Sequence, residues 1–255
     1  MSKTVLVIGG GAAGMMAAIF AARQGAAVTL LEPNERLGKK LNITGKGRCN
    51  VTNDASSEEL LAQIPQNSKF LYSSFSRFDG RDAMAFFEDL GVSLKVERGK
   101  RVFPVSDRSF DISGALEREL KRLHVVVQKD RAIGLINENG SILGARGEKS
   151  DYPADATILA TGGLSYPGTG STGDGYRFAE SVGHKIISPR ASLVALVSDD
   201  PCCAEMQGVA LRNVVVCVKT RESRTIFSEL GEMLFTHFGI SGPLVLSASS
   251  HMRNW

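Results

Sequence analysis

The apolar positions near the start of the chain fall into two short, nearly continuous runs, VLVI at residues 5–8 and VTLL at 28–31. Runs of this kind are typical of strands that are buried on both faces of a parallel sheet. Between them lie a glycine-rich turn and an alanine-rich segment that reaches about Arg23, and Gly25 suits the C-terminal cap of a helix. The first 32 residues therefore predict a strand, a turn, a helix and a second strand.

Two later segments have the apolar spacing of helices. Residues 81–90 and 111–123 each place their apolar side chains on one helical face. The side chains concerned are Met84, Phe87 and Leu90 in the first segment and Ile112, Leu116, Leu120 and Leu123 in the second. We interpret both stripes as core and not as cofactor contacts.

Strand patterns follow these helices. We expect strands at 124–128, 132–136, 142–145 and 156–160, with a hairpin turn at Asn139-Gly140. From about Ser192 the pattern changes to extended segments, which include 193–197 and 214–218. The change predicts a domain boundary near residue 190.

The turn after the first strand carries a nucleotide-binding fingerprint. Gly9, Gly11 and Gly14 form G-x-G-x-x-G, which permits a tight turn, close approach of the backbone to a pyrophosphate and close helix packing. The helix N-terminus, which includes Ala12 and Ala13, offers free amide donors and a partial positive charge to phosphates. The alternative is a glycine-rich turn in some other α/β protein.

An acidic residue at the end of the second strand favours the dinucleotide interpretation. Glu32 lies 18 residues after Gly14, where a carboxylate can accept hydrogen bonds from the ribose hydroxyls of an adenosine. A 2′-phosphate at this position would meet a like charge, so the site favours FAD or NAD over NADP. The fingerprint alone does not separate FAD from NAD.

A basic loop follows this strand. Residues 38–53, GKKLNITGKGRCNVTN, contain four cations, no acid and several glycines, and they fit neither a helix nor a strand template. We interpret the segment as a loop that binds a ligand. Its position suits a ligand that continues from a pyrophosphate towards a flavin.

Taken with two later segments, this loop resembles the YhiN/BaiN-like FAD-dependent oxidoreductases, which are also described as aminoacetone-oxidase-like flavoproteins. The matching segments are GKKLNITGKGRCNVTN, ATGGLSYPGTGSTGDGYRFAESVGHKI at 160–186, GEMLFTHFGISGPLVLSAS at 231–249 and the shorter KRVFP at 100–104. The resemblance implies an α/β, Rossmann-like FAD domain of the glutathione-reductase type at residues 1–190. It also implies that residues 191–255 begin a β-rich inserted substrate domain.

The resemblance further implies which residues contact FAD. Those of the basic loop are Lys40, Gly45, Arg48, Cys49 and Asn50, and those of the second segment are Thr161, Gly162, Gly163 and Asp174. The glycines would let backbone amides approach the cofactor, and the cations would offset the charge of the pyrophosphate. Lys39 and Lys46 are expected to be merely solvated.

Composition and charge set further expectations. With 43% apolar and 22% charged residues and a net charge of +3, the chain has the composition of an ordinary globular protein, and its interleaved charges predict no nucleic-acid partner. The four cysteines form no CxxC pair, which predicts no metal site and a reduced, cytoplasmic location. We also expect no membrane span. The oligomeric state stays open.

The catalytic residues are left unassigned. Cys49 could tune a flavin or simply pack beside it, and His237 could transfer a proton or serve in the core. Tyr166 could hold a substrate carbonyl through its hydroxyl. None of these alternatives is decided by the sequence.

Three functions remain open. The leading one is an FAD-dependent oxidoreductase that passes a hydride through the flavin, as a reductase of carbon–carbon double bonds or an amine oxidase of a small molecule. The chain has no second G-x-G-x-x-G, so NADH or NADPH would have to share the flavin site or act through another protein. The second is a non-catalytic FAD-binding fragment, because the chain reaches Trp255 without returning to the nucleotide domain. The third is an RNA-associated flavoprotein.

Overall fold

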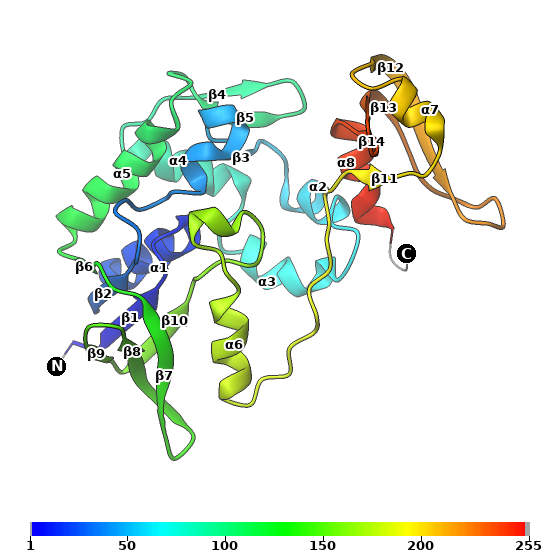
Figure 1. The fold of residues 1–255 in the computed structure, drawn as a ribbon. Helices are drawn as coiled ribbons and strands as arrows, with labels where there is room; N and C mark the ends of the chain where they lie inside the picture. The colour runs from blue at the N-terminus through cyan, green and yellow to red at the C-terminus, as the bar shows by residue number, and fades with distance from the viewer. Residues whose placement is uncertain (1, 253–255) are drawn as a thin grey trace. The chain divides into compact units, whose positions relative to one another are not determined.

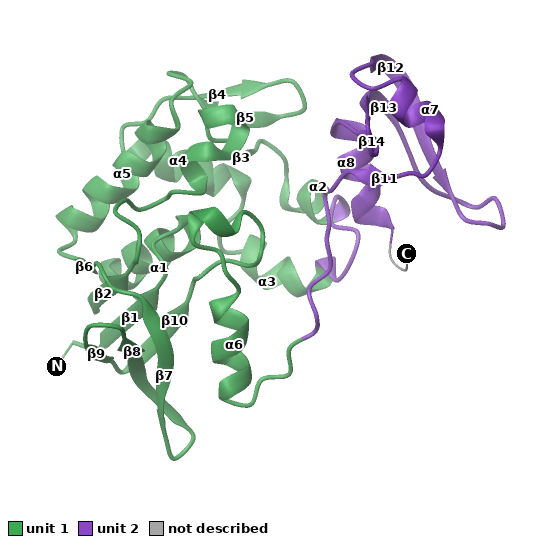
Figure 2. Cartoon of the chain, in the orientation of Figure 1, with its two compact units in different colours: residues 1–61, 69–186 green, residues 62–68, 187–255 purple. Residues whose placement is uncertain are grey.

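The computed structural model describes residues 2–252, and Figure 1 shows their fold. The chain divides into two compact units, which we call the larger and the smaller unit (Figure 2). The larger unit comprises residues 2–61 and 69–186, and the smaller one comprises 62–68 and 187–252. The single boundary expected near residue 190 did not anticipate that residues 62–68 group with the smaller unit.

A parallel sheet with the strand order β10-β1-β2-β6 forms the centre of the larger unit. Its strands are β1 (Thr4–Ile8), β2 (Ala27–Leu31), β6 (Val126–Gln128) and β10 (Ala156–Leu159). Ile8 of β1 lies opposite both Leu31 and Leu159, so three strands end at the same edge of the sheet.

Helices cover one face of this sheet. Val7 and Leu30 belong to a core cluster with residues of three helices. These helices are α1 (Ala12–Arg23), α4 (Gly80–Asp89) and α5 (Ser109–Arg122). Their apolar faces match the stripes expected from the sequence, since Phe87, Ile112 and Leu116 are buried.

The other face carries a second core cluster. Leu6 and Ile8 pack there with Ala145 and Phe178. These two partners come from β8 (Ser141–Gly147) and α6 (Asp174–Ser181). Because side chains of β1 enter both clusters, its run of consecutive apolar residues is explained.

Two antiparallel sheets complete the larger unit, with the orders β7-β8-β9 and β3-β5-β4. Asn139 and Gly140 turn the chain between β7 and β8 with φ of 50° and 80°, as a tight hairpin requires. The other strands and α-helices of this unit are β3 (Thr52–Asn53), α2 (Ser57–Ala62, whose last residue falls in the smaller unit), α3 (Tyr72–Phe75), β4 (Leu94–Glu97), β5 (Arg101–Pro104), β7 (Ala132–Glu138) and β9 (Asp151–Pro153). Short 3₁₀ helices lie at Ser68–Leu71 and Pro167–Thr169.

The basic loop becomes a compact, irregular segment. Leu41–Gly47 forms 3₁₀ turns interrupted by a kink, at which Gly45 and Lys46 have φ of 56° and 60°. The loop then enters β3, which pairs with β5. A glycine suits such a positive φ because it has no Cβ to clash with the backbone.

The smaller unit contains an antiparallel sheet of order β11-β14-β13-β12. Its elements are β11 (Leu196–Val197), α7 (Pro201–Glu205), β12 (Ala210–Lys219), β13 (Thr225–Thr236), β14 (Gly239–Ser241) and α8 (Pro243–His251). Helix α8 packs on β13, where Leu244 approaches Gly231.

Within residues 2–252, no helix is long and apolar enough to cross a membrane. No group of three or more His, Cys, Asp or Glu side chains is placed there to hold a metal ion.

Candidate cofactor-binding site

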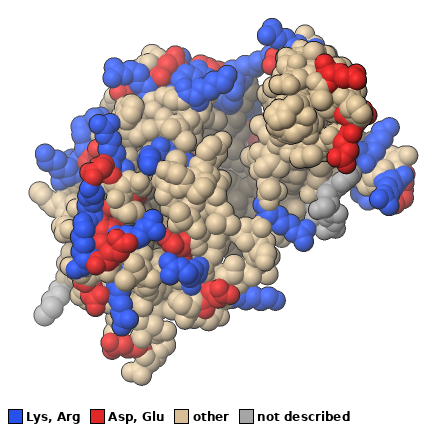
Figure 3. All heavy atoms as spheres, viewed as in Figure 1, with Lys and Arg blue, Asp and Glu red and all other residues tan. Residues whose placement is uncertain are grey.

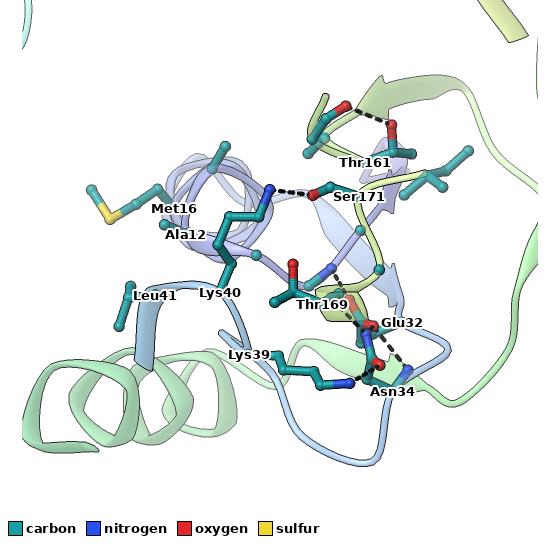
Figure 4. A pocket seen from close by; sticks show the side chains of 18 of the residues that line it. Ala12, Met16, Glu32, Asn34, Lys39, Lys40, Leu41, Thr161, Thr169 and Ser171 are labelled. Atoms are coloured by element: carbon teal, nitrogen blue, oxygen red, sulfur yellow. Dashed lines mark hydrogen bonds between the residues drawn. The ribbon is translucent and has the colours of Figure 1, made fainter. Parts of the chain in front are cut away.

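A cavity of about 860 Å³ opens in the larger unit at the edge where β1, β2 and β10 end. Its lining includes residues of the fingerprint turn, the basic loop and the start of α6 (Figure 4). The volume lies within the range of about 300–1,000 Å³ that is usual for ligand sites. Its place at the carboxyl ends of parallel strands is where open α/β sheets bind nucleotides.

The three fingerprint glycines serve two purposes. A Cβ on Gly9 would lie 2.5 Å from the carbonyl oxygen of Ala160, and a Cβ on Gly14 would overlap the carbonyl oxygen of Gly9. These two glycines therefore allow close packing of backbone on backbone. A Cβ on Gly11, in contrast, would meet no atom within 4 Å. Gly11 leaves open the space beside the backbone that a pyrophosphate requires.

The N-terminus of α1 faces this space. Gly11 caps the helix without a side-chain hydrogen bond, and Ala12 and Ala13 line the cavity. The first turn of α1 contains no acidic residue. Its free amides and the positive end of the helix dipole are therefore available to an anion.

Glu32 lies at the end of β2 and is 8% exposed. Its Oε2 accepts a hydrogen bond from the Gly10 amide at 2.7 Å, and its Oε1 accepts from the amide and the Nδ2 of Asn34 at 2.9 and 2.6 Å. A carboxylate has about four acceptor positions, so one remains free after these three bonds. Glu32 therefore also holds the fingerprint turn in place. Nothing in the sequence marks Asn34 as its partner.

Two lysines join the basic loop to the segment before α6, and Figure 4 shows the bond from Lys40 to Ser171. Lys40 Nζ donates to Ser171 Oγ and to the carbonyl oxygen of Ser165, both at 2.6 Å. Lys39 Nζ donates to the carbonyl oxygen of Gly168 at 2.8 Å. Lys39 is exposed, as we had expected, and its side chain also reaches across to this segment.

Cys49 and Asn50 both line the cavity. Cys49 is 3% exposed and has a φ of 63°, which is unusual for a residue with a side chain. Burial raises the pKa of the Cys49 thiol, and a hydrogen bond with Thr44 only partly opposes this. A thiol that stays protonated is a poor nucleophile, which favours the packing role of Cys49 over redox chemistry.

Thr161, Gly162 and Asp174 also line the cavity. Asp174 begins α6 and accepts hydrogen bonds from Arg177 at 3.0 Å and Thr172 at 3.1 Å. Burial acts to raise the pKa of Asp174, but these hydrogen bonds outweigh it, so the pKa is lowered and the carboxylate stays charged.

Arg48 does not line the cavity. Its guanidinium donates to Glu97 at 2.9 Å and Asp107 at 3.4 Å and lies 4.1 Å from the centre of the Phe103 ring. The side chain therefore anchors the basic loop to the hairpin of β4 and β5.

Three of the predicted glycines also lie outside the lining. They are Gly14, Gly45 and Gly163. Gly14 packs behind the fingerprint turn, and Gly45 lies against Phe103, where a Cβ would be 3.0 Å from the ring. At these two positions glycine shapes the chain behind the cavity.

The cavity also has residues that the sequence did not reveal. An apolar wall is formed by Met16, Leu41, Val51, Phe78, Phe87, Ile112 and Leu116. Three of these, Phe87, Ile112 and Leu116, come from the stripes that we had interpreted as core only. They are buried and also face the cavity, and helical spacing cannot distinguish the two roles.

The family model that describes the HI0933-like protein Rossmann domain matches residues 3–243. The chain belongs to this family. The resemblance to the FAD-dependent oxidoreductases that was stated from the sequence is thereby confirmed, and the Rossmann-like α/β fold agrees with it.

Curated relatives extend beyond this chain. It is 34% identical to a 3-dehydro-bile acid delta(4,6)-reductase of Clostridium scindens over 96% of this chain and 59% of the relative. It is 33% identical to a ribosomal RNA dihydrouridine synthase of Escherichia coli over 97% of this chain and 60% of the relative. The chain therefore spans about three fifths of the length of these proteins.

A solved structure agrees with the fold. A 3-ketosteroid-delta4-(5alpha)-dehydrogenase from Rhodococcus jostii RHA1 superimposes with a TM-score of 0.57 at 15% identity, over 83% of this chain and 59% of that one. At this level of identity the likeness concerns the fold alone.

Proposed function

We propose that this chain binds FAD and forms the nucleotide-binding part of a flavin-dependent reductase that acts on an activated carbon–carbon double bond. The observation that carries the proposal is the open cradle at Gly11, which lies at the free N-terminus of α1 and beside Glu32. Bound FAD would supply the hydride chemistry, as flavins do in oxidoreductases.

The residues of the cavity have separate parts in this proposal. The amides of Ala12 and Ala13 and the dipole of α1 bind the pyrophosphate, while the free acceptor position of Glu32 binds the ribose. The apolar wall around Ile112 and Leu116 excludes water from the cavity. Lys40, through Ser171, holds the segment before α6 against the basic loop.

Double-bond reduction is favoured over amine oxidation by the names of two relatives. One is a delta(4,6)-reductase, and the other is a dihydrouridine synthase. Dihydrouridine differs from uridine by two hydrogens added across a ring double bond that is conjugated to a carbonyl group. We therefore propose an α,β-unsaturated carbonyl compound as the substrate class, with NADH or NADPH as the electron donor.

A small molecule is our first candidate substrate. In the face drawn in Figure 3, acidic side chains lie among the cations, which favours a small molecule over a polyanion. An RNA uridine is the second candidate, because the dihydrouridine synthase is 33% identical over nearly the whole chain.

Anaerobic flavin titration tests the proposal. FAD-loaded protein that has been photoreduced with EDTA as the electron donor is mixed with a 4,6-dien-3-one steroid or a uridine-containing ribosomal RNA fragment, and a separate sample with oxidised flavin is mixed with aminoacetone. We expect one of the two unsaturated carbonyl compounds to reoxidise the flavin and to gain two hydrogens. Bleaching of the oxidised flavin by aminoacetone, with no reoxidation by either unsaturated compound, would contradict the proposal. Separate mixing with NADH and NADPH identifies the donor.

A further inference from the structure

Asp130 is a buried carboxylate to which the proposed function gives no role. It is 3% exposed and lies in the short connection between β6 and β7. Asp130, Arg131 and Ala132 form one part of the cavity wall. At Asp130 and Arg131 the wall is a connection between two strands and lacks the ladder of a sheet, so other hydrogen bonds must hold its backbone in place.

A shared carbonyl group places this wall beside Glu32. The carbonyl oxygen of Gln128 accepts hydrogen bonds from the amide of Glu32 at 3.0 Å and from the amide of Asp130 at 3.0 Å. Glu32 and the 130–132 wall therefore lie at the same end of the cavity. In the proposed function this is the adenosine end, because Glu32 binds the ribose.

The Asp130 carboxylate attaches this wall to the turn between β8 and β9. Its Oδ2 accepts hydrogen bonds from the Tyr152 hydroxyl at 2.9 Å and the Lys149 amide at 3.2 Å. Its Oδ1 accepts from the Arg131 amide at 2.8 Å, and the Arg131 carbonyl oxygen accepts from the Glu148 amide at 2.9 Å. The turn and the wall are thus held together on both sides of Asp130.

The charge states of this pair maintain the attachment. Burial acts to raise the pKa of Asp130, but hydrogen bonds from Tyr152 and from backbone amides outweigh it, so its pKa is lowered. Burial, followed by the bond to Asp130, raises the pKa of Tyr152. At neutral pH the carboxylate is therefore charged and the phenol remains a donor, which is the stronger, charge-assisted form of the hydrogen bond.

We propose that Asp130 and Tyr152 are positioning residues that set the affinity of the site for the adenosine half of FAD. They act by fixing the backbone of residues 130–132, against which that half of the cofactor lies. This inference rests on the proposed function. It adds that a pair of side chains outside the fingerprint determines how well an adenosine diphosphate fits.

The test compares FAD with ADP, which contains the adenosine end without the flavin. Tyr152→Phe removes one hydrogen bond, and Asp130→Asn replaces the charged acceptor. Asp151→Asn is the matched control, because Asp151 is an exposed acid next to Tyr152 in the same strand. FAD affinity is measured by flavin fluorescence, ADP affinity by displacement of FAD, and the thermal midpoint on the cofactor-free protein.

We expect Tyr152→Phe and Asp130→Asn to weaken FAD binding about tenfold, the factor that results if about 1.4 kcal/mol of the lost positioning reaches the binding step. ADP binding should weaken by the same factor, and Asp151→Asn should leave the affinities for FAD and ADP unchanged. A folded Tyr152→Phe protein with wild-type FAD affinity would overturn the inference. The inference would also be overturned if the variants bound FAD more weakly but bound ADP as well as the wild type does. It would be overturned as well if ADP did not displace FAD from the wild-type protein. Failure of the wild-type protein to bind any FAD would instead defeat the proposed function.

Discussion

Replacing Gly11 by valine should remove cofactor binding while leaving the fold intact. The φ of Gly11 is −74°, which any residue can adopt, and a Cβ there meets no atom within 4 Å. The matched change is Gly14→Ala, because a Cβ on Gly14 would overlap the carbonyl oxygen of Gly9. The two glycines lie three residues apart in one motif, yet the structure predicts opposite results for them.

The magnitudes follow from these surroundings. Valine is a poorer N-cap than glycine but restricts the unfolded chain, so the free energy of unfolding of Gly11→Val should change by no more than about 1 kcal/mol. Its side chain would occupy the space needed by the pyrophosphate and should weaken FAD by at least about 2.7 kcal/mol, or about a hundredfold. Gly14→Ala should cost about 3 kcal/mol or more of folding stability, because backbone must move to admit the methyl group.

Urea unfolding of the cofactor-free proteins and fluorescence titration with FAD measure the two effects separately. A folded Gly11→Val protein with wild-type FAD affinity would refute the phosphate role of the turn. A Gly14→Ala protein as stable as the wild type would refute the packing argument.

Three further predictions concern charged groups. Glu32→Gln should weaken FAD binding by about 1–3 kcal/mol and also lower the thermal midpoint. The reason is that Gly10 and Asn34 donate to different oxygens of the carboxylate, whereas the amide of glutamine has only one oxygen. Unchanged FAD affinity together with an unchanged thermal midpoint would contradict this geometry. Glu119 is buried between two arginines, with Arg122 the larger influence, and its pKa falls from 4.5 to about 2. Because the folded-state pKa is depressed, the Glu119 carboxylate contributes about 1–3 kcal/mol to the free energy of unfolding above pH 4.5, and this contribution is lost as the pH falls towards 2. Urea unfolding between pH 4.5 and 2 should therefore show a smaller loss of stability in Glu119→Gln than in the wild type. The same pH profile in both proteins would contradict this prediction. Lys40→Met should speed amide hydrogen exchange at residues 165–171, since their bonds to Nζ are lost, and unaltered exchange would show that this contact does not hold the segment.

The sequence predicted the features of this site that depend on local spacing. The fingerprint turn, α1 and Glu32 follow one another within a single β-α-β unit, so their chemistry can be inferred from three glycines and an acid. The same holds for the helical stripes of α4 and α5, whose spacing predicted the buried face. It did not predict that this face also forms the apolar wall of the cavity, because that depends on how the helices pack.

Long-range partners explain the other differences. Arg48 was expected beside the cofactor, but Glu97 and Asp107, which are far away in sequence, bind its guanidinium. Lys39 is exposed, as expected, but it also reaches the carbonyl oxygen of Gly168, a contact that its place in the sequence did not predict. Asp130 gave no signal at all, since its role depends on contacts with Lys149 and Tyr152, which lie about 20 residues further along the chain. A residue type does not reveal such contacts.

The central claim is that the cradle at Gly11, with Glu32 beside it, holds FAD, and identification of the bound cofactor tests it most directly. The purified protein is incubated with equal concentrations of FAD, FMN and NAD, washed and heated, and the released cofactor is separated by chromatography beside standards. We predict FAD at close to one molecule per chain. Recovery of NAD alone from folded protein would contradict the account.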